Sequence, residues 1–148
     1  MVRAHGTLLA HDVGELVGVS GTTIGQWARR GYIKSSQRET EPRLYSVEDV
    51  AEAAIVHALI ERGVRRADIR GAAARLRSSG HPWPFSEGRV ATSGRAGRRG
   101  WRPRLLFRDD DGDSEWLELT ARGWQAVADA GGLREVRLRL RTQPPTAS

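Results

Sequence analysis

The chain has 148 residues, of which 39% are hydrophobic, and it carries a formal net charge of +6 at pH 7. This length allows one ordinary domain or two small ones. The absence of cysteine excludes disulfides, thiolate catalysis and cysteine-based metal sites. Because no apolar run approaches the roughly 20 residues of a membrane span, and the first residues do not form a secretory signal, we expect a cytoplasmic protein.

The positive charge comes almost entirely from arginine, and Lys34 is the only lysine. The planar guanidinium group binds phosphates and guanine edges with a fixed fork, which suits a nucleic-acid partner. A GC-rich genome would give the same ratio of arginine to lysine without a functional reason. The total charge does not depend on that ratio, so a polyanionic partner remains the expectation.

Two short helices joined by a glycine-containing turn are predicted near the start of the chain. The first spans about 11–17 and the second about 21–30, where Gly31 stops it. Between them, Gly18 permits a positive φ angle and Ser20 can cap the second helix. The apolar residues predicted to face inward are Val13, Leu16, Val17, Ile24 and Trp27. Two helices with this spacing form a helix-turn-helix.

A polar, irregular stretch over 32–43 separates this motif from a third helix. After a short extended piece at 44–45, Ser46 is a good N-cap with Asp49 three residues later, which is an acidic form of the capping box. The helix that follows, over 47–62, is predicted to be strongly amphipathic. Its apolar stripe consists of Val50, Ala54, Ile55, Ala58 and Leu59.

A fourth helix is predicted over about 66–78, with Gly80 and Pro82 closing this part of the chain. Its inward residues are predicted to be Ile69, Ala73 and Leu76. Its arginines are predicted to form a solvated face, made of Arg65, Arg66, Arg70, Arg75 and Arg77. We therefore expect a first domain over 1–80.

The rest of the chain is predicted to be a small strand-rich domain over 81–142, which serves dimerisation or partner binding, with a disordered tail over 143–148. The sequence Trp83-Pro84-Phe85 provides an aromatic anchor at its start. The stretch over 93–103 is rich in glycine and arginine and is expected to be mobile. Two roles for it stay open: an arm that follows DNA phosphates, or a solvated surface loop.

Strands are predicted in this second part at 89–92, 104–107 and 115–119, the last two joined by an Asp-Gly turn at 111–112. A short helix capped by Thr120 is predicted over 121–130. The segment over 133–141 alternates apolar and basic residues, which is typical of a half-buried strand with Val136, Leu138 and Leu140 on one face. The expected fold class is α+β, with four N-terminal helices followed by strands and one short helix.

The segments HDVGELVGVSGTTIGQWARRGYI (11–33) and RLYSVEDVAEAAIVHALIERGV (43–64) resemble the DNA-binding domain of MerR-family regulators, to which excisionase-type winged helices are similar. The resemblance covers about residues 8–78. It implies a winged helix-turn-helix whose second helix enters the major groove and whose wing touches the DNA backbone. Pro82 and its neighbours depart from the family, because they break the chain where classical members continue into a coiled coil. The second part loosely resembles helix-turn-helix antitoxins of VapBC-type modules.

The second helix supplies most of the candidate contacts with DNA. Thr22, Thr23 and Gln26 have short polar side chains that can reach base edges or phosphates. Arg29 and Arg30 lie at the end of the helix, where they either bind phosphate or simply favour the helix dipole. The candidate DNA-binding residues are Ser20, Thr22, Thr23, Gln26, Arg29, Arg30, Lys34, Arg38, Arg43 and Tyr45.

The wing supplies the remaining candidates. Lys34, Arg38 and Arg43 lie in it or beside it. Tyr45 matches the position of a backbone-contacting tyrosine in the family, although packing beneath the wing is an alternative. Trp27 is expected in the core, because it shares a face with the apolar Ile24.

These observations predict a sequence-specific regulator that binds double-stranded DNA as a homodimer and has no catalytic residues. The alternatives are a DNA-binding antitoxin with a toxin partner and an excisionase-like architectural protein. No cofactor or metal is expected, because the four histidines are scattered without ligand spacing. The acidic run over 109–113 lacks the spacing of a calcium loop and is expected to be a hairpin turn.

Overall fold

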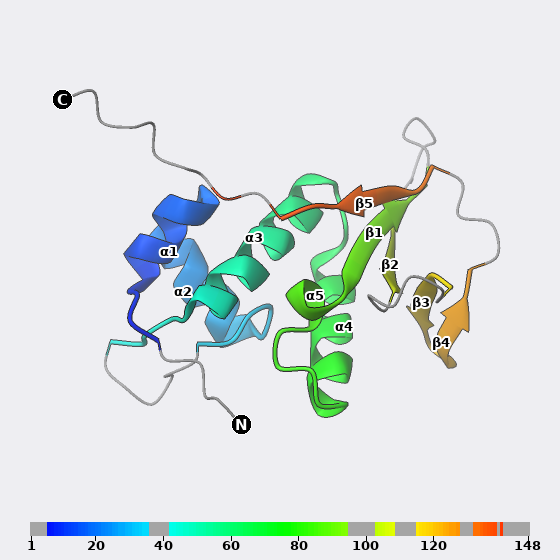
Figure 1. Cartoon of the computed structure of the whole chain (residues 1–148), viewed down its shortest axis with the longest axis horizontal. Coiled ribbons are helices and arrows are strands. Elements are labelled where there is room, and N and C mark those ends of the chain that lie inside the picture. Colours follow the sequence, from blue (N-terminus) through cyan, green and yellow to red (C-terminus); the bar gives the residue numbers. More distant parts are fainter. Residues whose placement is uncertain are drawn as a thin grey trace.

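The computed structural model describes residues 6–35, 42–94, 103–108, 115–127, 132–138 and 140. In these residues the chain is α+β, as predicted: five helices come first and a five-stranded antiparallel sheet follows. Figure 1 shows α1 and α2 at one end of the molecule and the sheet at the other, with α3, α4 and α5 between them. Within the described part of the chain, no helix is long and apolar enough to span a membrane.

The predicted helix-turn-helix is confirmed by α1 (Ala10–Val17) and α2 (Gly21–Arg30). Gly18 has a φ angle of 99° and Gly31 one of 84°, values that glycine adopts without a steric penalty. The Ser20 hydroxyl accepts a hydrogen bond from the Thr23 amide at 3.1 Å and so caps α2. Apolar side chains on the inner faces of both helices are buried: Val13, Val17, Ile24 and Trp27.

The helix α3 (Val47–Glu61) is the central helix of the fold. Its capping box is confirmed, because the Ser46 hydroxyl accepts from the Asp49 amide while Asp49 accepts from the Ser46 amide. The predicted amphipathic character is wrong, since α3 packs on α1, α4, α5 and β5 and is buried on most sides. Two of its carboxylates, Asp49 and Glu52, are buried with its apolar residues.

The predicted fourth helix is confirmed as α4 (Arg66–Ser78), with Ile69 and Ala73 buried. A single-turn helix that the sequence did not predict, α5 (Pro84–Glu87), follows it. Proline is favoured in the first turn of a helix because its missing N–H has no partner there in any case. The aromatic anchor is confirmed by Phe85, which is completely buried.

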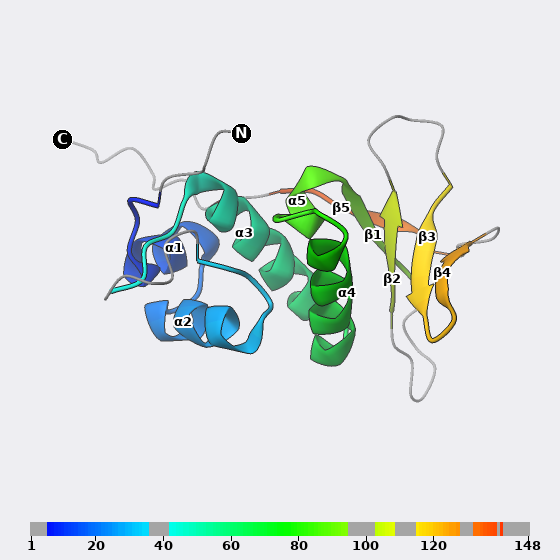
Figure 2. The same ribbon diagram turned by 90° about the horizontal axis from the view of Figure 1, so that it is seen from below.

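The strands follow in the order β1 (Arg89–Ser93), β2 (Arg104–Arg108), β3 (Leu117–Thr120), β4 (Gly123–Ala126) and β5 (Arg134–Val136). They lie in the sheet in the order β4-β3-β2-β1-β5, and every neighbouring pair is antiparallel. The three strands predicted first are confirmed, with small shifts at their ends. Figure 2 shows α4 lying between α3 and the sheet.

The helix predicted over 121–130 is wrong, because β3 and β4 form a tight hairpin there. The Thr120 hydroxyl, instead of capping a helix, donates to the Gly123 carbonyl at 2.9 Å and accepts from the Arg122 amide at 3.1 Å. Gly123 has a φ angle of 103°, which a helix does not permit. The hairpin brings Trp124 edge-on against Phe107, with ring centroids 5.4 Å apart. The packing of the two aromatic rings stabilises the strand more than the local sequence favours a helix.

The strand predicted over 133–141 is only partly correct. The strand β5 has three residues, and Val136 is buried opposite Val90 of β1. Leu138 and Leu140 have 49% and 40% of their surfaces exposed, so the apolar face of the predicted strand is not buried beyond Val136. The partner that an alternating strand needs is therefore provided by β1 of the same chain.

Several predictions lie outside the described residues. These are most of the glycine- and arginine-rich stretch, the Asp-Gly turn at 111–112, the middle of the wing at 36–41 and the tail over 143–148.

One hydrophobic core joins the helices to the sheet. It contains residues of α1 to α5 together with Val90, Leu105, Phe107 and Val136 of the strands. At the end of α3, Arg62 donates to the Thr92 hydroxyl and to the carbonyls of Arg134 and Glu135, at 2.8–3.1 Å. The boundary predicted at residue 80 separates the candidate DNA-binding residues from the sheet. The hydrophobic core contains residues from both sides of this boundary.

Candidate nucleic-acid interface

The outer face of α2 presents polar and basic side chains along its length. Thr22, Gln26 and Arg30 follow one another at four-residue intervals and therefore lie on one side of the helix. Thr22, Arg29 and Arg30 are exposed and Gln26 is half-buried. Figure 2 shows α2 at the outer edge of the helical end, on the side away from the sheet. This face has the composition and the accessibility that base and phosphate contacts require.

Ser20 and Thr23 are committed to the start of α2. Their hydroxyls are 2.9 Å apart, in addition to the bond between the Thr23 amide and Ser20. The two side chains fix the first turn of the helix. Their hydroxyls retain acceptor capacity for a DNA partner, but their positions are determined by capping.

The base of the wing is closed by a hydrogen bond from the Ser35 hydroxyl to the Leu44 carbonyl. Next to it, Tyr45 and Leu8 form an antiparallel bridge, in which the backbone amide of each residue donates to the carbonyl of the other. Arg43 lies at this base and is half-buried. Arg38 lies outside the described residues.

Tyr45 is 1% exposed, which favours the packing alternative over a contact with the DNA backbone. Burial raises the pKa of its hydroxyl, while the neighbouring charges of Arg43 and Arg29 oppose that shift. Tyr45 thus supports the segment that carries candidate cations, and its direct contact with DNA stays a prediction.

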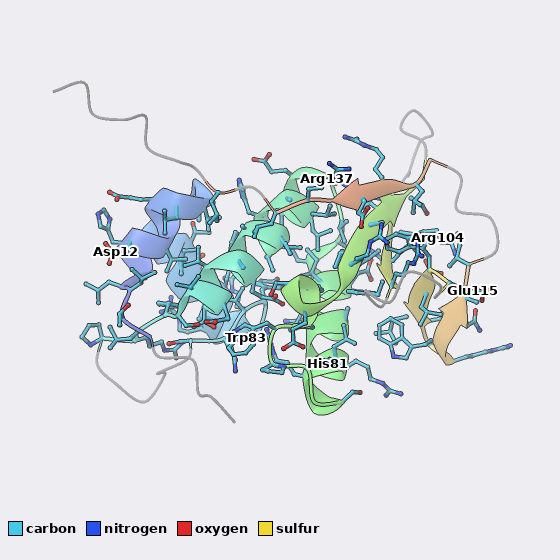
Figure 3. The ribbon with its side chains drawn as sticks, in the orientation of Figure 1. Asp12, His81, Trp83, Arg104, Glu115 and Arg137 are labelled. Atoms are coloured by element: carbon cyan, nitrogen blue, oxygen red, sulfur yellow. The ribbon has the colours of Figure 1, made fainter. Side chains whose placement is uncertain are left out.

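Lys34 lies four residues after the end of α2 and is half-buried against Trp83. Its ammonium group lies 4.5 Å from the centroid of the Trp83 ring, which is a cation–π contact. The indole N–H of Trp83 in turn donates to Asp49 Oδ1 at 2.9 Å. In Figure 3, Trp83 lies where the helices meet the start of α5, far from Arg104 in the sheet.

Glu52 connects α3 to α5 at the same junction. Its carboxylate accepts from the Phe85 and Ser86 amides, both at 2.9 Å, and so satisfies amides at the start of α5. Burial raises its pKa to about 7, although these hydrogen bonds and the charge of Arg77 oppose the shift. A buried acid at this position links the helical part to the chain that leads into the sheet.

Arg77 was predicted to lie on the solvated face of α4, and this prediction is wrong. Its guanidinium group donates to the Gly31 carbonyl at 2.8 Å and to the Tyr32 carbonyl at 3.1 Å, at the end of α2. Helical spacing indicates that Arg77 shares the inner face of α4, since it follows the buried Ala73 by four positions and Ile69 by eight. The prediction of a solvated Arg77 depended on its charge alone and not on this spacing.

Residues 10–76 match the family model described as MerR HTH family regulatory protein. We call this matched segment the MerR-type region. The chain has no significant match among curated proteins or among solved structures.

The MerR-type region begins at the start of α1 and ends at residue 76, in the last turn of α4. It contains every candidate DNA-binding residue, as well as Asp49 and Glu52. The match supports DNA binding and a role in transcriptional regulation. The helix α5 and all five strands lie after it.

Proposed function

We propose that this protein is a transcriptional regulator that binds specific sites in double-stranded DNA through α2, and that it is not an enzyme. The observation that carries the proposal is the exposed polar and basic face of α2 within the MerR-type region. An α-helix fits the major groove, where each base pair presents a distinct pattern of donors and acceptors.

The side chains divide between two tasks. Gln26 has an amide that can bind adenine with two hydrogen bonds, so it is our candidate for reading a base. Arg29 and Arg30 are exposed at the end of α2 and are suited to phosphates, as are Lys34 and Arg43 beside the wing. Phosphate contacts position the protein, and base contacts provide sequence preference.

Replacing Gln26 with alanine is expected to relax preference at one base pair, at a cost of about 1–3 kcal/mol for the preferred site. Replacing Arg30 with alanine is expected to weaken binding to all sequences and to lower the slope of log affinity against log salt by about 0.9. The measurement is a salt titration of binding to a site selected from random DNA with the purified protein.

Arg122→Ala is the matched control, because it removes one exposed arginine from the β3–β4 turn, at the opposite end of the molecule from α2. It is expected to leave both the sequence preference and the salt slope nearly unchanged. If the Gln26 and Arg30 variants also bind as the unaltered protein does, α2 is not the recognition helix.

We further propose that the protein acts as a homodimer on a palindromic site. Exposed leucines flank β5, with Leu133, Leu138 and Leu140 each having 40–49% of their surface accessible. The free surface of these side chains provides an apolar contact for a second copy. A truncation after Gly80 is not a suitable test of dimerisation, because it would remove Phe85 and Val90 from the shared core and so disturb the fold itself.

Sedimentation of a variant with Leu138→Asp and Leu140→Asp provides the test. The unaltered chain is expected to be dimeric at micromolar concentration and the double variant monomeric, because each aspartate would bring an unpaired charge into the apolar contact. Val47→Asp alters another exposed apolar residue, 73% accessible, at the start of α3 and should remain dimeric. A monomeric unaltered protein would refute this proposal.

A further inference from the structure

The end of α2 is held by an arginine from a different helix. Arg77, in the last turn of α4, donates through Nη1 to the Gly31 carbonyl and through Nη2 to the Tyr32 carbonyl. The two distances are 2.8 Å and 3.1 Å, and the contacts span 46 and 45 residues of sequence. One side chain thus joins α4 to the turn that ends α2.

This contact has a specific physical effect on α2. The last carbonyls of a helix have no partner within it, and they form the negative end of the helix dipole. Arg77 binds the two carbonyls that directly follow α2, so its positive charge lies beside this negative end and interacts favourably with the dipole. Because the guanidinium group is planar and makes two bonds, it fixes the direction of the turn as well as its distance from α4.

The positive charge of the guanidinium group is also favoured by two acids of α3. The charges of Glu52 and Asp49 act on Arg77 and oppose the lowering of its pKa by burial. Both carboxylates are buried and engaged by the segment that follows α4, Glu52 by the Phe85 and Ser86 amides and Asp49 by the Trp83 indole. Arg77 is therefore located at the meeting point of α2, α3, α4 and the approach to α5.

The segment that Arg77 holds carries candidate phosphate contacts on both sides. Arg29 and Arg30 immediately precede Gly31, and Lys34 follows Tyr32 by two residues. We propose that Arg77 is a positioning residue for DNA recognition, which sets the orientation of the end of α2 without touching DNA. This inference rests on the proposed function of α2.

The test compares Arg77→Lys with Arg75→Lys. Lysine keeps the positive charge beside the buried acids but cannot form the planar two-bond fork. Arg75 is exposed in the same turn of α4 and supplies the identical chemical change away from the contact. Affinity is measured for a selected site and for an unrelated duplex, at a temperature at which thermal melting shows both variants to be folded.

Arg77→Lys is expected to lower affinity for the selected site by about fivefold or more and to reduce the ratio of specific to nonspecific affinity, whereas Arg75→Lys changes neither. A residue that only stabilises the fold would lower the melting temperature and leave the affinity of the folded protein unchanged. Unchanged affinity and ratio in folded Arg77→Lys would therefore overturn the inference.

A second variant, Arg77→Gln, replaces the first if lysine prevents folding. Its side chain is shorter and uncharged and carries both N–H donors on a single nitrogen, so it cannot reproduce the fork of two nitrogens, and folded Arg77→Gln is expected to show the same losses. If neither variant folds, Arg77 is a residue of the fold alone and the inference is overturned. Failure of the unaltered protein to select any DNA site would instead remove the proposed function, and so the two failures are distinguishable.

Discussion

Replacing Gly14 with alanine is expected to lower the free energy of unfolding by at least about 2 kcal/mol. A Cβ atom at this position would lie 2.5 Å from the Val19 carbonyl oxygen and 3.0 Å from the Gly21 nitrogen. Both are backbone atoms, one in the turn between α1 and α2 and the other at the start of α2, so neither can move without opening the helix-turn-helix. Urea unfolding monitored by circular dichroism measures the loss.

Gly71→Ala provides a control of opposite sign. Gly71 is exposed inside α4, and a Cβ atom there would meet nothing within 4 Å. Alanine is expected to stabilise the protein by about 0.5–1 kcal/mol, because glycine loses more conformational freedom in a helix. Equal effects of the two substitutions would show that the turn accommodates a side chain at Gly14.

Between pH 5 and pH 8, the protein is expected to lose about 2 kcal/mol of stability through Glu52 alone. Burial raises the pKa of this carboxyl group from 4.5 to about 7 in the folded protein. A raised pKa means that the folded state binds more protons than the unfolded state between these values. The stabilising contribution is therefore fully present below pH 4.5 and is lost as the pH rises through 7.

Comparison with Glu52→Gln isolates this contribution, because the two proteins differ in no other ionisable group. Glutamine does not ionise, so its altered hydrogen bonds to the Phe85 and Ser86 amides shift stability equally at every pH. The free energy of unfolding of the unaltered protein minus that of the variant should fall by about 2 kcal/mol from pH 5 to pH 8.

Glu48→Gln controls for the loss of one carboxylate, because Glu48 is exposed in the first turn of the same helix. Its unfolding curves are measured beside those of Glu52→Gln under the same conditions. A constant difference between the unaltered protein and Glu52→Gln across this pH range would show that Glu52 is not the titrating group.

The sequence by itself determined the local architecture of the MerR-type region. The turn at Gly18, the caps at Ser20 and Ser46 and the stop at Gly31 each depend on neighbours within a few residues. Such features follow from backbone sterics and short-range hydrogen bonds, which are the same in any tertiary context. The candidate face of α2 follows from helical spacing for the same reason.

The end of the chain shows what local pattern could not determine. Ala121 to Ala130 have the composition of a helix, but pairing with β3 and the contact of Trp124 with Phe107 select a strand from Gly123 to Ala126. The alternation after Leu133 predicts a long strand, but only Arg134–Val136 pairs with β1. Both outcomes depend on residues distant in sequence, because a strand is stabilised mainly by its neighbours in the sheet.

Only the tertiary structure determined the junction behind α2. Arg77, Glu52 and Asp49 are charged residues that composition assigns to the surface, yet each is at least partly buried with partners more than 30 residues away. Burying a charge is favourable only when opposite charges and hydrogen-bond partners are brought to it. Those partners come from α2, α4 and the start of α5, and folding is what brings these elements together.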